Sequence, residues 1–555
     1  MTPQRRKSSI LNGHKIFFIL ILCLFGLCLI QQTMAQRQRG KTRQQDDRVY
    51  LLHADELYYD EFARPGVQIV KGKVSFLHKG ARLLCDSAYF RQEENSFEAF
   101  GHVRLLQGDT LSLNSEYAYY DGRDEMVRAR RNVVLRHRKS TLYTDSLDYD
   151  RKFNFGYFFE GGKLIDGKNN LVSDWGEYNT LTREAVFYYG VKLKSPKYTI
   201  NTDTLHYDTR RSMAHVLGPS TILSDGNTVN TTDGYYDTKQ DRTELFGRST
   251  IINKNKEITA DSLFSNSKTG MNEALGNVIY VDKENKNELH ADYCTYNEKA
   301  GTALATKNAM VVDYSQGDTL WMHADTLRMK TFFINTDSAY REVYGYYKVR
   351  AYRNDLQAVC DSAVINSKDS CLTMLRDPIV WNGGRQLLGE RIKVFMNDST
   401  IRFAHVIGQA SSIELMEDKE HYNQIASREM KAYFNEGKIR MSEALGNVQT
   451  IYYPIDDKDS SIIVLNYLEG DTMRMHFDDT RKLEKIWVSK PNGTAYPLTQ
   501  VPPGRDKLEN FAWFDDIRPR DKDDIFVWRG KTGGTELKPQ VRREPPIQKL
   551  KGVAP

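Results

Sequence analysis

The sequence predicts an all-β fold, an elongated repeat β-jelly roll or solenoid of stacked antiparallel strands. Two short phrases recur in fixed order at a spacing of about 30 residues. Between turns, apolar and polar residues alternate with a period of two, as in a strand with one buried face. The 555-residue chain holds 32 tyrosines but only 15 prolines, and aromatic side chains suit half-buried strands. No stretch after Tyr50 shows sustained helical periodicity.

The N-terminal residues have the features of an export signal. Four basic side chains precede the run from Ile16 to Ile30, which is apolar apart from Gly26 and two cysteines. Its length of about fifteen residues suits a signal peptide and is short of the roughly 20 that a membrane span needs. We expect residues 1–35 to be a signal peptide or an uncleaved signal anchor, followed by a polar linker over 36–49. Both alternatives place the rest of the chain outside the cytoplasm.

The formal charge of +5 is concentrated near the ends of the chain. Residues 1–48 carry about nine Lys and Arg against two Asp, so their removal leaves a net charge of about −2. The middle of the chain is therefore mildly acidic. This balance argues against nucleic acid as a partner, because such binding depends on neutralising phosphates.

The first phrase reads small or apolar residue, Asp, Ser or Thr, Leu, any residue, Tyr, as in Thr144–Tyr149 and Thr202–Tyr207. With Asp174 between Asp145 and Asp203, successive aspartates lie about 28 to 36 residues apart, and Asn114 divides the one longer interval. Asp followed by Ser or Thr bonds the local backbone, so we expect these aspartates to fix the turn into the next strand. The expected turn anchors are Asp55, Asp86, Asp145, Asp203, Asp233, Asp261, Asp292, Asp325 and Asp361.

The second phrase follows about 15 residues later and reads apolar residue, Gly, polar residue, Val or Ile, then alternation. Phe100–Leu105 and Leu275–Tyr280 are clear examples. The glycine is expected to permit a bend or bulge. Each repeat is then strand, turn, strand, turn, and it cannot bury its apolar face without stacked neighbours.

These repeats predict a β domain over residues 50–490, with about 13 repeats and room for two consecutive subdomains. Residues 491–555 are richer in proline and mixed charge and contain the aromatic island Phe511–Phe514. We expect this tail to be a flexible docking segment.

The inward positions of the repeats would form one apolar interior along the stack. In a closed stack this interior is only a core, whereas splayed sheets would make it a groove long enough for acyl chains. The expected groove-lining residues are Val74, Phe76, Val103, Leu105, Val278, Tyr280 and Val311.

No catalytic residue, metal site or cofactor is predicted. The anchor aspartates recur in nearly every repeat, which favours a structural role over the acid/base pair of a carbohydrate hydrolase. The sequence contains no nucleophile elbow, phosphate-binding glycine loop or zinc helix motif. Cysteine is too sparse to define the fold, and only Cys360 and Cys371 are close enough in sequence for a local disulfide.

The two phrases together resemble the OstA/LptA family of periplasmic lipopolysaccharide-transport proteins, best seen in Ala260–Leu263 followed by Ala274–Val278. The resemblance covers about residues 50–450, and the chain is about three times as long as the short members. It implies an open, V-shaped antiparallel jelly roll in the periplasm that holds lipid A acyl chains in an apolar groove. It also implies partners joined by edge-strand pairing: the inner-membrane complex, the outer-membrane translocon and further copies of the chain.

Two other functions remain open from the residues alone. One is a structural or adhesive β-solenoid of the cell envelope. The other is a carbohydrate-active β-helix enzyme, which would need a carboxylate cluster in a single rung.

Overall fold

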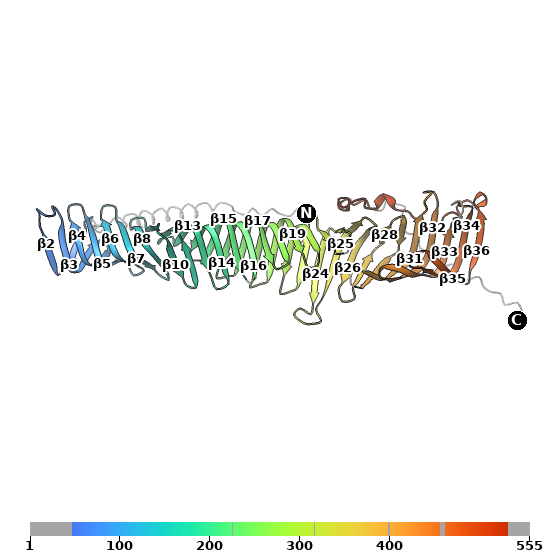
Figure 1. The fold of residues 1–555 in the computed structure, drawn as a ribbon, viewed down its shortest axis with the longest axis horizontal. Coiled ribbons are helices and arrows are strands. Elements are labelled where there is room, and N and C mark those ends of the chain that lie inside the picture. Colours follow the sequence, from blue (N-terminus) through green and yellow to red (C-terminus); the bar gives the residue numbers. More distant parts are fainter. Residues whose placement is uncertain (1–46, 225, 316, 398–399, 456–460, 531–555) are drawn as a thin grey trace, which may run out of the picture. The chain divides into compact units, whose positions relative to one another are not determined.

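The computed structural model describes residues 47–530 except 225, 316, 398–399 and 456–460 (Figure 1). This part of the chain contains two compact units divided after Glu160. Nearly all regular structure in both units is β-strand, which confirms the all-β prediction. The described helices are three 3-10 turns at Leu498–Gln500, Asp515–Ile517 and Asp524–Phe526. None of the helices in this part of the chain is long and apolar enough to cross a membrane.

Several expectations fall beyond the described part of the chain. The export signal over residues 1–35, most of the linker over 36–49, and residues 531–555 of the tail all lie outside the described residues.

The first unit is built from antiparallel neighbours that follow one another in sequence. β3 pairs with β4, β4 with β5, and so on to β8. β1 and β2 both pair with β3, so they are two halves of one strand. The strands are β1 (Tyr50–His53), β2 (Glu56–Tyr59), β3 (Gln68–His78), β4 (Ala81–Arg91), β5 (Ser96–Gln107), β6 (Leu111–Asp121), β7 (Met126–His137), β8 (Ser140–Asp150) and β9 (Phe155–Phe158).

The second unit continues the same pairing rule. β13 to β20 pair in sequence order. The strands up to that point are β10 (Gly162–Asp166), β11 (Asn169–Ser173), β12 (Trp175–Asn179), β13 (Glu184–Lys194), β14 (Tyr198–Asp208), β15 (Met213–Ser224), β16 (Asn227–Asp237), β17 (Arg242–Asn253), β18 (Lys256–Asn266), β19 (Met271–Asp282) and β20 (Asn287–Asn297).

Beyond β20 many strands are split into two halves that pair with one long neighbour. β21 and β22 both pair with β20, and β35 and β36 both pair with β34. These strands are β21 (Thr302–Thr306), β22 (Met310–Asp313), β23 (Leu320–His323), β24 (Thr326–Phe332), β25 (Tyr340–Arg353), β26 (Leu356–Asn366), β27 (Cys371–Leu375), β28 (Ile379–Asn382), β29 (Arg385–Leu388), β30 (Arg391–Asn397), β31 (Thr400–Leu415), β32 (Tyr422–Asn435), β33 (Lys438–Tyr452), β34 (Val464–Phe477), β35 (Leu483–Ser489) and β36 (Asn492–Pro497).

Alternate strands bend at a bulge made by two consecutive left-handed residues. In β5, Gly101 and His102 have φ of 69° and 41°, and the register to β6 skips them. Gly276 and Asn277 do the same in β19. At the gap between β21 and β22, Lys307 and its neighbour take similar φ values. The predicted role of the glycine at a bend is confirmed.

The expected turn anchors were placed wrongly. Asp86 lies in the middle of β4, where its Oδ2 is 2.8 Å from His102 Nδ1 at the bulge of the next strand. Asp261 Oδ2 likewise accepts a hydrogen bond from Asn277 Nδ2 at 2.8 Å. The two phrases therefore recur in a fixed order, because the aspartate of the first phrase contacts the bulge that the second phrase forms in the next strand.

The turns at the strand ends are made by a different acidic or amide residue, at the end of the first phrase. Asp208 Oδ1 accepts hydrogen bonds from the backbone N–H groups of Arg210 and Arg211, at 2.7 and 2.9 Å. This is an Asx turn, which aspartate and asparagine both favour. The position recurs at a spacing of about 29 residues, as Asp121, Asp150, Asn179, Asp208, Asp237 and Asn266.

Residues 498–530, which we call the C-terminal strap, follow β36 and return across the second unit. The buried side chains of Phe514 and Ile517 pack against Ile379 and Trp381. The expectation of a flexible tail is wrong for this segment, because its aromatic island is part of a packed cluster.

The bulge geometry gives a stability prediction with a matched control. Gly101→Ala and Gly80→Ala both place alanine at positive φ, of 69° and 76°, which costs about 1–2 kcal/mol. A Cβ at Gly101 would also lie 3.0 Å from Asp86 Cγ, whereas nothing lies within 4 Å at Gly80. We expect urea unfolding to show a loss at Gly101 that exceeds the loss at Gly80 by about 1–3 kcal/mol. Equal losses would contradict the contact between the bulge and Asp86.

Candidate functional site

In the first unit the inward positions are filled by large side chains. Phe76 and Phe97 stack at 4.1 Å between ring centroids, and Phe97 lies 5.1 Å from Tyr120. All three are 2% exposed or less. The interior of this unit is therefore a closed, close-packed core. Four of the expected groove residues, Val74, Phe76, Val103 and Leu105, are buried in this core.

The tyrosine that ends the first phrase is buried in successive repeats of both units. Tyr120 and Tyr149 lie in the first unit, and Tyr178, Tyr207 and Tyr236 lie in the second. Tyr207 Oη donates to Asp166 Oδ2 and accepts from Asn169 Nδ2, both at 2.9 Å. Burial raises the pKa of Tyr207 and of Tyr236 well above the usual range for a phenol. These rings stay neutral and fill the space between the two halves of each bent strand.

This series of tyrosines ends at Ser265, which is the next position in the series. Thr243 of β17 pairs with Tyr236 of β16 on one side and with Ser265 of β18 on the other, so Ser265 takes the inward position that Tyr236 has two strands earlier. Replacing a large ring by a hydroxymethyl group leaves space unfilled. From β17 onward the inward side chains become half-exposed.

One row of half-buried apolar residues crosses consecutive strands on the inward face. Directly paired residues lie on one face of a sheet. Ile251 pairs with Ile258, and Ile258 pairs with Tyr280. The same register continues through Leu289, Val311, Met322, Ala351, Ala358, Val380 and Leu387.

A cluster of buried residues, half of them alanines, forms the floor beneath this row. Ala291, Ala305 and Ala324 belong to one buried cluster that continues to Ala410 of β31. Such short side chains cannot reach across to fill the space between the walls. The partly buried residues packed against the floor are Leu289, Cys294, Val311, Met322, Ala358, Leu372, Val380, Leu387, Val394 and Met430.

We call this surface the inner strip: the buried floor from Ala291 to Ala410, its partly buried neighbours, and the adjoining Ile251, Ile258 and Tyr280. Of the expected groove residues, Tyr280 and Val311 are half-buried within it, and Val278 is buried at its floor level. The sequence analysis missed Ile258, Leu289 and Met322. The sequence signal that could have indicated these residues is the replacement of the tyrosine that ends the first phrase by Ser265.

The inner strip is uncharged at neutral pH. Desolvation raises the pKa of the Cys294 thiol to about 11 and that of Cys360 to about 12, so both remain protonated. Burial likewise raises the pKa of Tyr280. Cys360 and Cys371 are free thiols, so the local disulfide is not formed. Cys371 pairs with Asn366 at the end of β26, whereas Cys360 lies near the bend.

Comparison with known proteins identifies the N-terminal part of the chain. Residues 46–203 match the model of the family described as OstA-like protein. This part of the chain is an OstA-like domain. The OstA-like match comprises the first unit and the start of the second, and the inner strip lies C-terminal to it.

Solved structures include a similar chain. LptH of Pseudomonas aeruginosa, described as the LptA-homologous periplasmic component of the lipopolysaccharide transport device, is 13% identical. The match covers 31% of this chain and 84% of LptH, with a TM-score of 0.10. A search of curated proteins found no match.

The contrast between closed core and inner strip can be measured in the second unit. Tyr236 is 7% exposed and packs on Tyr198, with 5.3 Å between ring centroids. Tyr236→Ala should lower the free energy of unfolding by about 3–5 kcal/mol, because it leaves a cavity. Tyr280→Ala should cost roughly half of that or less, because the ring is already half-exposed. Equal losses in urea unfolding would mean that Tyr280 lies in a closed core.

Proposed function

We propose that the protein is a non-catalytic periplasmic bridge that binds lipopolysaccharide and helps to carry it to the outer membrane. The observation that carries the proposal is the inner strip, a continuous row of partly buried apolar side chains over a buried floor. The OstA-like domain supports the assignment to lipopolysaccharide transport.

Lipid A acyl chains fit the chemistry of the inner strip. Large exposed apolar surfaces on a folded protein mark interaction sites, because leaving them in water is unfavourable. Each methylene removed from water contributes about 0.8 kcal/mol. Contacts with a single row of side chains, such as Tyr280, Leu289 and Val311, therefore add up along an extended chain.

The outer strands supply surfaces for the proposed partners. Among the described residues, β2 pairs only with β3, and its Leu57, Tyr58 and Tyr59 are more than half exposed. In the second unit, β35 exposes Ile486 and Trp487, and the described pairings join it only to β34. Edge strands are templates for strand addition. We assign these edges to pairing with the inner-membrane complex, the outer-membrane translocon or another copy of the chain.

Photocrosslinking in cells tests lipid binding with matched controls. A photoreactive phenylalanine at Tyr280 or Met322 should capture lipopolysaccharide, because both side chains belong to the inner strip. The preceding residues, Ile279 and Trp321, are also half-buried but lie on the opposite face of the same strands. They should capture at least tenfold less. Similar capture from both faces, or none from Tyr280 and Met322, would refute the lipid-binding proposal.

Depletion of the protein tests the transport role separately. Newly made lipopolysaccharide should accumulate before the outer membrane, and pulse labelling with membrane fractionation would detect this. Normal delivery after depletion would favour a structural role in the envelope.

A further inference from the structure

The C-terminal strap covers the outer face of the strands whose inner face carries the inner strip. Val359 of β26 contacts the strap cluster of Phe514 and Ile517, while its neighbours Ala358 and Cys360 belong to the inner strip. Farther back along the strap, Leu508 packs with Ile451. The strap and the inner strip therefore lie on opposite faces of the same strands.

Three glutamines, on β26, β29 and β32, hold the strap by its backbone and one side chain. Gln424 donates to Asp506 O and accepts from Leu508 N, both at 2.9 Å. Gln386 donates to Ala512 O at 2.7 Å and accepts from Phe514 N at 2.8 Å. Gln357 accepts from Arg518 Nε at 2.7 Å. The amides of Gln424 and Gln386 each satisfy both a donor and an acceptor of the strap backbone, as buried polar groups require.

The last contact of the strap differs, because it is made by a buried arginine. Arg350 of β25 is 3% exposed, and its Nε donates to Ile525 O. The Trp528 ring lies 5.4 Å from its guanidinium carbon. Its Nη1 is buried without a hydrogen-bond partner, and no ion pair joins it to an acidic side chain of the described residues.

An unpaired buried charge is costly, so Arg350 requires an explanation. Desolvation lowers the pKa of Arg350 to about 10, which still leaves the guanidinium charged at neutral pH. A buried donor without a partner in a folded protein indicates a missing ligand, ion or water.

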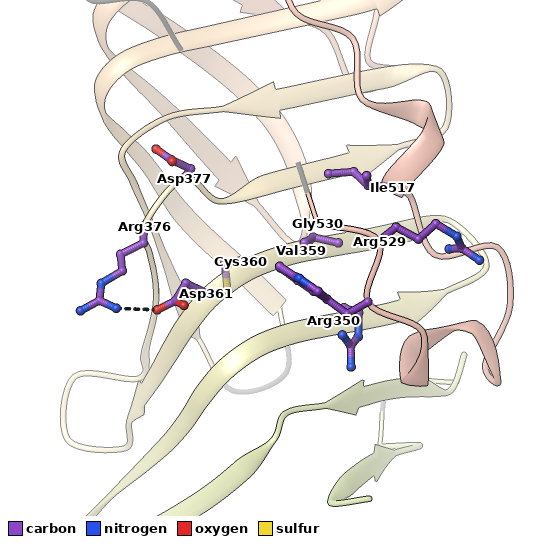
Figure 2. A pocket seen from close by; sticks show the side chains of 10 residues that line it. Arg350, Val359, Cys360, Asp361, Arg376, Asp377, Ile517, Arg529 and Gly530 are labelled. Atoms are coloured by element: carbon purple, nitrogen blue, oxygen red, sulfur yellow. Dashed lines mark hydrogen bonds and ion pairs between the residues drawn. The ribbon is translucent and has the colours of Figure 1, made fainter. Parts of the chain in front are cut away.

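Arg350 lines a cavity of about 300 Å³ beneath the end of the strap (Figure 2). Arg529 lies on the same side of the cavity as Arg350, and Asp361, Arg376 and Asp377 lie opposite (Figure 2). Arg376 pairs with Asp361 at 2.9 Å, and Arg529 pairs with Asp524. Among the described residues Arg350 is therefore the lining arginine that forms no ion pair, although the carboxylates of Asp325 and Asp524 act on its charge and Asp377 lines the same cavity.

We propose that this cavity binds a small oxyanion, a single carboxylate or phosphate group, between Arg350 and Arg529, and that the bound anion fastens the strap to the sheet. A guanidinium binds either group through charge-assisted hydrogen bonds. The volume lies at the lower end of small-molecule sites. Because Arg350 and Arg529 come from β25 and the strap, one anion links both. The lining shares Cys360 with the inner strip, whereas the charged lining residues are not members of the strip.

Thermal unfolding of the full-length protein at constant ionic strength tests the proposal. Inorganic phosphate or acetate should raise the Tm relative to chloride, and the rise should grow with concentration. The anion that acts identifies the group as phosphate or carboxylate. Arg350→Met should weaken the apparent affinity at least tenfold, because it removes charge-assisted hydrogen bonds. Arg385→Met, at a half-exposed arginine paired with Glu414, should retain the full response.

Hydrogen exchange supplies a local readout. The anion should slow exchange over residues 515–530 in the unchanged protein and not in Arg350→Met. If Arg350→Met fails to fold, Arg529→Met provides the same comparison. The proposal is overturned if neither anion stabilises the protein beyond chloride, or if the arginine variants respond as the unchanged protein does.

Discussion

The structure depends on the bend in its long strands. Two consecutive left-handed residues, such as Gly276 and Asn277, interrupt the ladder, and an acidic side chain of the preceding strand contacts them. A flat strand would present one apolar face to a single layer. A bent strand turns its two halves toward each other, so that both bury apolar side chains on the inward side. Repetition of this bend converts a simple meander into a stack with an interior.

What fills that interior decides whether it is a core or a binding surface. Tyr207 and Tyr236 fill the space and are buried, and their inward neighbours are buried with them. After Ser265 half of the buried floor residues are alanines, and Leu289 and Met322 are partly buried above it. Side-chain volume at the inward positions therefore differs between the two parts, and beyond β20 many strands are also split into two halves. The OstA-like domain and the proposed lipid-binding strip are therefore successive parts of one repeat pattern.

The outer face shows a second use of the same strands. Where the C-terminal strap packs on the sheet, Trp381 and Phe514 are buried in one cluster, and Gln386 donates a hydrogen bond to the strap backbone. Arg350 stands apart from these satisfied contacts, because its charge is buried without an ionic partner. The two faces thus carry different chemistry: apolar side chains on the inside, and charged side chains of both signs at the end of the strap.

The sequence by itself determined the strand class, the repeat and the position of the bends, because these depend on local alternation and on glycine at positive φ. The turn residues are also present in the sequence, but Asp203 and Asp208 lie within a few residues of each other. Only the folded chain shows that Asp208 makes the Asx turn and Asp203 does not. Tertiary structure alone decided which inward positions are half-exposed, since the exposure of Tyr280 depends on the volume of residues on other strands. It also placed the strap, because the partners of Gln357 and Arg350 lie more than a hundred residues away, beyond the reach of any local pattern.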